Sequence, residues 1–209
     1  AGPSPGQGDH HRGRTRFVNP RPSLLAPCTT ATVSRLHEAI WRIVAPNPGP
    51  LTGPGTNTYV LGTDRSVVID PGPEDAAHVE RILAATGGTI DRILCTHSHP
   101  DHSPAAASLR RLTGARVYGL PPPVDRYQDE TYAPDAGLAE GEHIDVAGIA
   151  LIAIHTPGHA SNHVCFLAED NGLLFTGDHL MSGSTVVIIP PDGSMRQYLE
   201  SLRALRRRP

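Results

Sequence analysis

The chain has 209 residues, the length of one ordinary domain or of one domain with a tail. Gly and Pro occur 21 times each, which indicates many turns and argues against a helical bundle or a coiled coil. The 18 basic residues, all arginine, and 21 acidic residues give a net charge of −3, which excludes a strongly basic nucleic-acid-binding domain.

No apolar run approaches 18 residues, so the sequence predicts no membrane partner, and we expect a cytoplasmic protein. Residues 1–27 are rich in Gly, Pro and Arg and are predicted to form a flexible arm, with residues 28–209 as the domain. His10 and His11 lie in that arm and are given no metal-binding role. The scattered Cys28, Cys95 and Cys165 lack a CxxC pair, which indicates buried, reduced thiols.

The first half of the domain alternates predicted strands with predicted helices. Strands are expected over 41–44, 57–61, 66–70, 90–96 and 115–120, with a hairpin turn at 62–65. Helices are expected over 74–85 and 105–113. Val79 and Ile82 lie on the apolar face of the first helix, and we expect His78 to be exposed. This alternation predicts a sheet covered by helices.

The second half is predicted to be rich in strands. An irregular connection over 121–141 precedes expected strands at 143–146, 149–155, 163–168 and 173–176. A final helix is expected over 195–208, with its apolar face formed by Tyr198, Leu199, Leu202 and Leu205. Basic residues at the end of this helix suit the negative end of its dipole.

The segment THSHPDH at 96–102 places four metal-ligand side chains directly after a predicted strand. These side chains, His97, His99, Asp101 and His102, converge only if the backbone leaves the strand and forms a tight loop, since a strand would point them to alternate faces. Imidazoles and a carboxylate without a thiolate suit Zn²⁺, with Fe or Mn as alternatives. Two later side chains, His159 and Asp178, also follow predicted strands and extend the pattern.

These motifs resemble the metallo-β-lactamase superfamily, whose signature is HxHxDH followed by a His and then by an Asp. The resemblance covers about residues 41–208, and it implies an αββα sandwich, a four-layer α/β fold. Within the superfamily, GTNTYVLG at 55–62, VIDPG at 68–72 and TPGHASNH at 156–163 resemble bacterial relatives of the β-lactamase-like endoribonuclease group.

The resemblance implies a ligand set for two metal ions. His97, His99 and His159 would hold the first ion, Asp101 and His102 the second, and Asp178 would bridge them. The superfamily carries a further His near the C-terminus, whereas no His follows His179 in this sequence. We therefore expect the C-terminal end of the domain to be missing and the second ion to bind less tightly than the first.

Other residues near these motifs are expected to support the site. We expect His163 to be a hydrogen-bonded structural residue, and His179 to lie next to the ligands without being one. The resemblance also suggests that Asp70 orients a ligand His by accepting its free N–H.

The predicted function is zinc-dependent hydrolysis by a metal-bound hydroxide of an ester, thioester or lactone-type small molecule. Asp101 and His102 are the catalytic candidates, with Asp101 orienting the hydroxide or carrying a proton to the leaving group. RNA is the alternative substrate, as for a metal-dependent endoribonuclease. The second alternative is a non-catalytic or redox metal scaffold. The sequence gives no oligomeric state.

Overall fold

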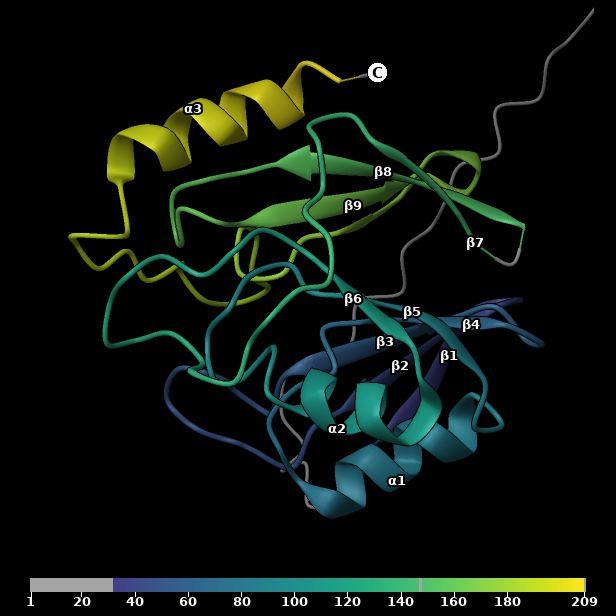
Figure 1. The fold of residues 1–209 in the computed structure, drawn as a ribbon. Helices are drawn as coiled ribbons and strands as arrows, with labels where there is room; N and C mark the ends of the chain where they lie inside the picture. The colour runs from purple at the N-terminus through teal and green to yellow at the C-terminus, as the bar shows by residue number, and fades with distance from the viewer. Residues whose placement is uncertain (1–31, 147, 209) are drawn as a thin grey trace, which may run out of the picture.

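The computed structural model describes residues 32–146 and 148–208. The arm predicted over residues 1–27, with His10 and His11, lies outside the described residues, as does Cys28. Two sheets stack face to face, with α1 and α2 outside one sheet and α3 outside the other (Figure 1). This arrangement confirms the αββα sandwich expected from the sequence.

The larger sheet has six strands in the order of the chain. They are β1 (Val33–His37), β2 (Ile40–Val44), β3 (Asn57–Leu61), β4 (Ser66–Ile69), β5 (Ile90–Leu94) and β6 (Arg116–Tyr118). The strands from β1 to β4 pair antiparallel, whereas β4, β5 and β6 run parallel. Parallel neighbours need crossover connections, and α1 (Ala76–Ala85) and α2 (Ala105–Thr113) provide them.

The smaller sheet is antiparallel, with the spatial order β10, β9, β8, β7. Its strands are β7 (His143–Val146), β8 (Ile149–His155), β9 (Val164–Ala168) and β10 (Leu173–Phe175), with a 3-10 turn, η1 (Glu169–Asn171), between the last two. The helix α3 (Met195–Arg206) packs on the outer face of this sheet, where Leu205 contacts the cluster formed by Ile152, Ile154 and Cys165.

The main core lies between the sheets. Phe166 and Leu151 of the smaller sheet pack with Ile69 and Leu94 of the larger one, and all four side chains are fully buried. A second cluster joins the larger sheet to α1 and α2. The strand β4 is therefore buried on both faces, which explains its almost continuous apolar sequence, whereas Asp91 and Arg92 at the start of β5 are half-buried.

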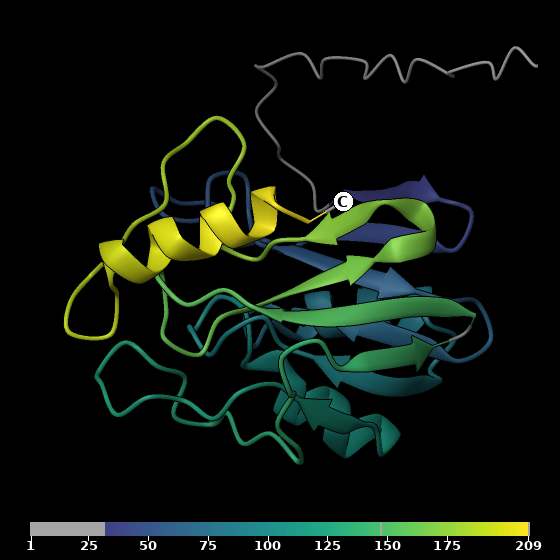
Figure 2. The ribbon, with the colours of Figure 1, turned by 90° about the horizontal axis from the view of Figure 1, so that it is seen from above.

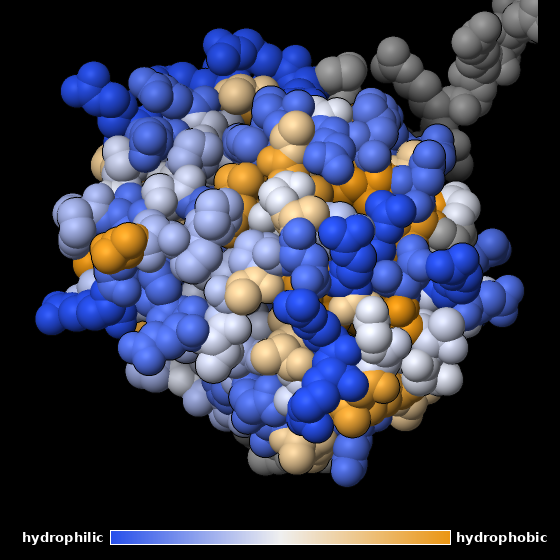
Figure 3. Space-filling model, viewed as in Figure 1, coloured by the Kyte–Doolittle hydropathy of each residue, from blue (hydrophilic) through white to orange (hydrophobic). Residues whose placement is uncertain are grey.

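The longer loops gather at one end of the sandwich, on the left in Figure 2. The face in Figure 3 is mainly hydrophilic, with its apolar side chains in separate patches. Across the described residues, no helix combines the length and the apolar character needed to cross a bilayer. Cys95 and Cys165 are buried free thiols, as expected.

The predicted elements are confirmed with shifts at their ends, and two further elements, β1 and η1, were not predicted. The largest difference in packing concerns α3. Tyr198, Leu202 and Leu205 are half-buried, whereas Leu199 is 41% exposed although it was predicted on the apolar face. The face of α3 that packs on the sheet is thus narrower than the apolar face predicted from the sequence.

The prediction that His78 is exposed is wrong, because its side chain is fully buried. The buried face of α1 includes His78 beside Val79 and Ile82, so it is wider than the predicted stripe. One ring nitrogen, Nε2, lies 2.9 Å from the Thr58 hydroxyl of β3. Burial, followed by the positive charge of Arg81, lowers the pKa of His78 to about 4.

This buried imidazole makes stability depend on pH. Between pH 6.5 and about 4 the unfolded chain binds a proton at His78 that the folded chain does not, so stability falls as the pH falls through this window. Between pH 7 and pH 4, we expect the free energy of unfolding of His78→Gln to fall by about 3 kcal/mol less than that of wild type, as measured by urea unfolding. The exposed His143→Gln is the matched control, and parallel profiles for wild type and His78→Gln would contradict the assignment.

Candidate metal centre

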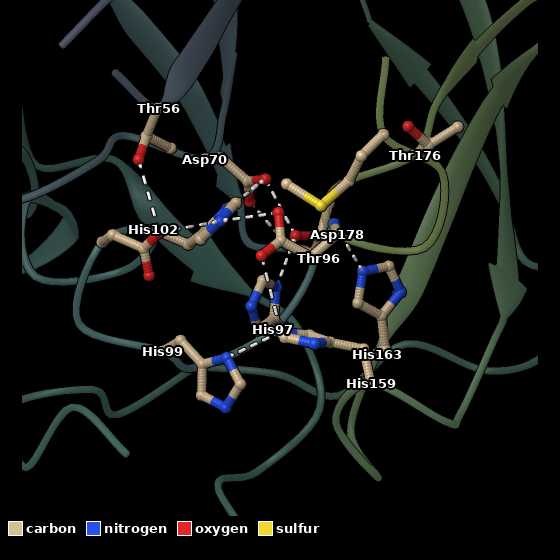
Figure 4. A network of polar contacts seen from close by, with 12 residues as sticks. Thr56, Asp70, Thr96, His97, His99, His102, His159, His163, Thr176 and Asp178 are labelled. Carbon is tan, nitrogen blue, oxygen red and sulfur yellow. Dashed lines mark hydrogen bonds and ion pairs between the residues drawn. The ribbon is translucent and has the colours of Figure 1, made fainter. Parts of the chain in front are cut away.

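The site lies where strands of both sheets end, so side chains distant in sequence meet there (Figure 4). The larger sheet provides Asp70 after β4 and the loop from Thr96 to His102 after β5. The smaller sheet provides His159 between β8 and β9, and Asp178 after β10. The predicted tight loop is confirmed, because residues 97–104 contain no strand or helix and α2 begins at Ala105.

Asp70 holds this loop in place through three hydrogen bonds. Its carboxylate accepts hydrogen bonds from the Thr96 N–H at 2.7 Å and the Thr96 hydroxyl at 2.8 Å. It also accepts from His102 Nδ1 at 2.9 Å, which is the role predicted for it. The φ of Asp70 is 49°, in the left-handed region, so the backbone turns sharply as β4 ends.

The same contacts set the tautomers of two histidines. Because the Thr96 hydroxyl donates to Asp70, it accepts from His97 Nδ1, 3.0 Å away. His97 Nε2 then carries a lone pair, and it is buried without a hydrogen-bond partner among the described residues. His102 likewise donates from Nδ1, which leaves its Nε2 facing Asp178 Oδ1 at 3.3 Å.

His159 is oriented from the opposite side. Its Nδ1 donates to the Val187 carbonyl at 2.6 Å, so its Nε2 is unprotonated. That Nε2 lies 2.9 Å from His99 Nδ1 and 3.5 Å from Asp178 Oδ2. Asp178 therefore faces His102 with one carboxylate oxygen and His159 with the other.

Two groups of three ligand atoms, each group within 4.8 Å, result from this packing in the described part of the chain. They are His97 with His99 and His159, and His97 with His102 and Asp178. Two donors of one tetrahedral ion, each about 2.0–2.2 Å from it, lie roughly 3.3 Å apart, close to the separations found here. The donor set and the unpartnered His97 Nε2 therefore fit a zinc-type or iron-type ion.

The predicted second-site residue Asp101 lies at the edge of these groups. Its Oδ2 is 3.5 Å from His102 Nε2 and accepts from the Thr56 hydroxyl at 3.5 Å. It is absent from both groups of three, so the structure brings it to the site but places it less tightly than Asp178.

Burial and neighbouring charges set the protonation of the cluster. Burial, followed by the positive charge of nearby histidines, lowers the pKa of His97 and lowers that of His99 to about 4. Burial alone would lower the pKa of His102, but Asp178, Asp70 and Asp101 outweigh it and raise the pKa. Conversely, His102 holds the pKa of Asp178 below its usual range despite burial. The carboxylate of Asp178 is thus ionised at neutral pH, as a metal ligand must be.

A pocket of about 380 Å³ opens above the cluster. His99, Asp101, His159 and Asp178 lie on its floor. Its walls are mainly apolar and include Leu51, Tyr127, Met181, Val187 and Ile189.

The two supporting histidines differ in their contacts. His163 is fully buried and hydrogen-bonded through both ring nitrogens, which confirms the structural role predicted for it. His179 is also fully buried, but neither of its nitrogens has a hydrogen-bond partner among the described residues. It belongs to neither group of metal-binding donors. The sequence analysis missed Thr96 and Val187, because a hydroxyl and a main-chain carbonyl carry no motif of their own.

Comparison with known proteins agrees with this geometry. A family model described as "Metallo-beta-lactamase superfamily" matches residues 51–209. The chain is 39% identical over 160 residues to "Atrochrysone carboxyl ACP thioesterase" of Passalora fulva, covering 73% of this chain and 46% of that protein. It is 32% identical over 184 residues to "Lactamase-like protein aptB" of Emericella nidulans, covering 83% and 54%. The chain thus spans about half the length of these curated relatives.

A solved structure described as "Crystal structure of TTHA1623 in a di-iron-bound form" is similar over most of both chains. Its TM-score is 0.62 at 28% identity, covering 78% of this chain and 85% of that one. The narrower resemblance to bacterial relatives of an endoribonuclease group is not supported by these matches, since the curated relatives are fungal lactamase-like and thioesterase proteins.

The shared position of His97 gives a testable ranking of the ligands. We expect His97→Ala to lose nearly all bound metal, because this residue belongs to both groups, whereas His99→Ala and His102→Ala each disrupt one group and retain part of it. Elemental analysis after gel filtration measures this, with the exposed His143→Ala as control. Equal metal content in the His97 and His99 variants would contradict the assignment of His97 to both groups.

Proposed function

Because this chain belongs to the metallo-beta-lactamase superfamily, we propose that it is a metal-dependent hydrolase of apolar acyl thioesters. Residues 28–209 are the proposed hydrolase domain. The observation that carries the proposal is the pocket of about 380 Å³, whose apolar walls stand directly over the histidine and aspartate cluster.

The proposed ligands follow from the geometry of the donors. His97, His99 and His159 would hold one ion, His102 and Asp101 would contribute to a second, and Asp178 faces both sides. A divalent metal held there supplies Lewis acidity, which activates water and polarises a carbonyl group. We propose Zn²⁺ for this donor set, with iron as the alternative because the similar TTHA1623 was solved in a di-iron-bound form.

Asp101 is the residue that we propose moves a proton. It lies on the pocket floor, and its carboxylate accepts from Thr56 and lies near His102 Nε2. From this position Oδ2 can accept a proton from the attacking water and release it toward the leaving group. His102 is held by Asp70, so its contribution is to keep Asp178 and Asp101 in fixed positions.

The walls of the pocket favour an apolar acyl group. Leu51, Met181, Val187 and Ile189 offer apolar surface and would exclude water from the bound acyl chain. An acyl group bound against them would lie in the same pocket as Asp101 and Asp178. A thioester is the favoured substrate because thiolate is a good leaving group, and because a relative carries the name thioesterase.

The same pocket disfavours RNA. Its lining contains Asp125 and Asp192 besides the floor aspartates, and no arginine of the described chain is part of it. A phosphodiester backbone is bound through cationic side chains, which this lining does not offer. A structural metal site is usually closed off by its four protein ligands. Such a site is also disfavoured here, because His99, Asp101, His159 and Asp178 line the open pocket.

A substrate panel tests the activity. We expect zinc-loaded protein to hydrolyse medium-chain acyl thioesters faster than the matched oxygen esters, lactones, β-lactams and a single-stranded RNA, each compared by kcat/KM. Chelation should abolish the activity and zinc should restore it. His97→Ala is the negative control. Preferred cleavage of RNA or of a lactam would overturn the thioesterase proposal.

The apolar wall predicts a dependence on chain length. Ile189→Ala removes wall surface that is 45% exposed, without touching a proposed ligand. We expect KM for a medium-chain thioester to rise roughly five- to tenfold, as for a loss of about 1 kcal/mol of apolar contact, while KM for the acetyl thioester stays unchanged. The exposed Val124→Ala, outside the pocket lining, serves as the matched control. An equal rise in KM for both thioesters would show that Ile189 does not contact the acyl chain.

A further inference from the structure

His163 lies beside the proposed metal ligands, next to Asp178, without belonging to either group of donors (Figure 4). Its side chain is fully buried. Its ring stacks on that of His97, with centroids 5.0 Å apart and an interplanar angle of 29°. Its Nε2 accepts a hydrogen bond from the Asp178 N–H at 3.2 Å. One side chain therefore contacts the ligand shared by both groups and also holds the backbone of Asp178.

The direction of these hydrogen bonds is fixed by chemistry. A main-chain N–H can only donate, so His163 Nε2 is unprotonated and the ring proton lies on Nδ1. That Nδ1 donates to the Thr156 hydroxyl at 2.8 Å. The Thr156 hydroxyl also lies 3.2 Å from Cys165 Sγ. By accepting the Nδ1 proton, Thr156 stabilises the tautomer of His163 that accepts from Asp178.

The turn before Asp178 is packed against the same ring. Gly177 has a φ of +46°, and a Cβ added there would lie 2.7 Å from His163 Nε2 and 2.5 Å from the Thr96 hydroxyl. No side chain fits in that space, so the turn rests directly on His163 and Thr96. The position of the Asp178 carboxylate is therefore set by contacts on its own main chain.

We propose that His163, in the tautomer stabilised by Thr156, is a positioning residue that holds Asp178 between His102 and His159. The inference rests on the metal site proposed above. Asp178 faces His102 with Oδ1 and His159 with Oδ2, so a small rotation of the turn at Gly177 moves both contacts together. Loss of the hydrogen bond from Asp178 N–H to His163 should thus weaken metal binding although every ligand side chain is still present.

The first test compares two replacements of His163. His163→Leu keeps the volume and removes the acceptor, whereas His163→Gln places an amide oxygen near the position of Nε2. We expect the zinc affinity of His163→Leu to fall about 10- to 100-fold, the usual effect of losing a partner of a metal ligand, and His163→Gln to recover part of it. Competition with a chromophoric chelator measures the affinity.

The second test leaves His163 in place and changes the tautomer. Thr156→Val removes the acceptor of Nδ1–H, while Thr156→Ser retains it. The alternative tautomer would point Nε2–H at the Asp178 N–H, so we expect Thr156→Val to weaken zinc binding about tenfold and Thr156→Ser to match wild type. Visible absorption of the Co²⁺-loaded proteins should change in Thr156→Val, reporting altered ligand geometry.

The matched control is His78→Leu, which also removes a buried, hydrogen-bonded imidazole but lies against β3 and belongs to neither group of metal-binding donors. It should lower thermal stability and leave zinc affinity unchanged. Unchanged zinc affinity in both His163→Leu and Thr156→Val, with wild type binding zinc, would overturn the positioning role and leave the proposed function intact. Wild type that binds no zinc would instead overturn the metal site itself. If His163→Leu does not fold, Thr156→Val decides the question.

Discussion

The buried carboxylate of Asp70 is the interaction on which the site depends. It is 2% exposed and lies at the boundary of the two-sheet core, where an unpaired charge would be strongly unfavourable. Three donors satisfy it: the main-chain N–H and hydroxyl of Thr96, and the ring of His102. Satisfying this charge requires the backbone after β5 to leave the sheet at Thr96, and the same turn converts the segment from His97 to His102 into a loop. The charge therefore orders the loop and, through Thr96, also sets the tautomer of His97.

A second constraint is that each sheet supplies only part of the ligand set. His97, His99 and His102 follow β5, whereas His159 and Asp178 follow strands of the smaller sheet. The distances between them depend on the packing of Phe166 and Leu151 against Ile69 and Leu94 in the core between the sheets. Binding of an ion across this interface would favour the packed arrangement over the unfolded chain, so metal affinity and stability are linked.

The sequence predicted the site better than its surroundings for a physical reason. The ligand types and their place after strand ends indicated His97, His99, His102, His159 and Asp178 as candidate ligands, and the structure brings these five side chains together. Ligation restricts both the chemistry and the location of a side chain, so such candidates are visible in a sequence. Packing restricts only shape and polarity, so His78 was predicted on the exposed face of α1 although Thr58 of β3 provides it with a buried partner. The strand β1 was missed as well. It is an edge strand, and four of its five residues are exposed, so its apolar residues do not mark a buried face.

The residues that orient the ligands were the least predictable part. Each of these residues hydrogen-bonds the Nδ1 atom of a histidine, as Thr96, Thr156 and the Val187 carbonyl do here. No periodicity or spacing in the sequence predicts such a hydrogen bond. Asp70 and His163 were identified as supporting residues only because they lie next to recognisable motifs. Their partners become apparent once the ends of β4, β5, β8 and β10 are brought together in space, since the contacts join residues that are 7 to 32 positions apart.

The contact between Val187 and His159 joins substrate binding to ligand geometry. The Val187 carbonyl accepts the His159 proton at 2.6 Å, and the Val187 side chain belongs to the pocket wall. The segment from Met181 to Asp192 therefore lines the pocket and fixes a proposed ligand at the same time, and Asp192 also accepts from the Ser161 N–H near that ligand. A side-chain change at Ile189 alters the wall alone, whereas any change that shifts the main chain at Val187 also rotates the imidazole of His159. The proposed acyl specificity of this pocket can thus vary through its side chains, while the proposed metal centre would restrict the path of its main chain.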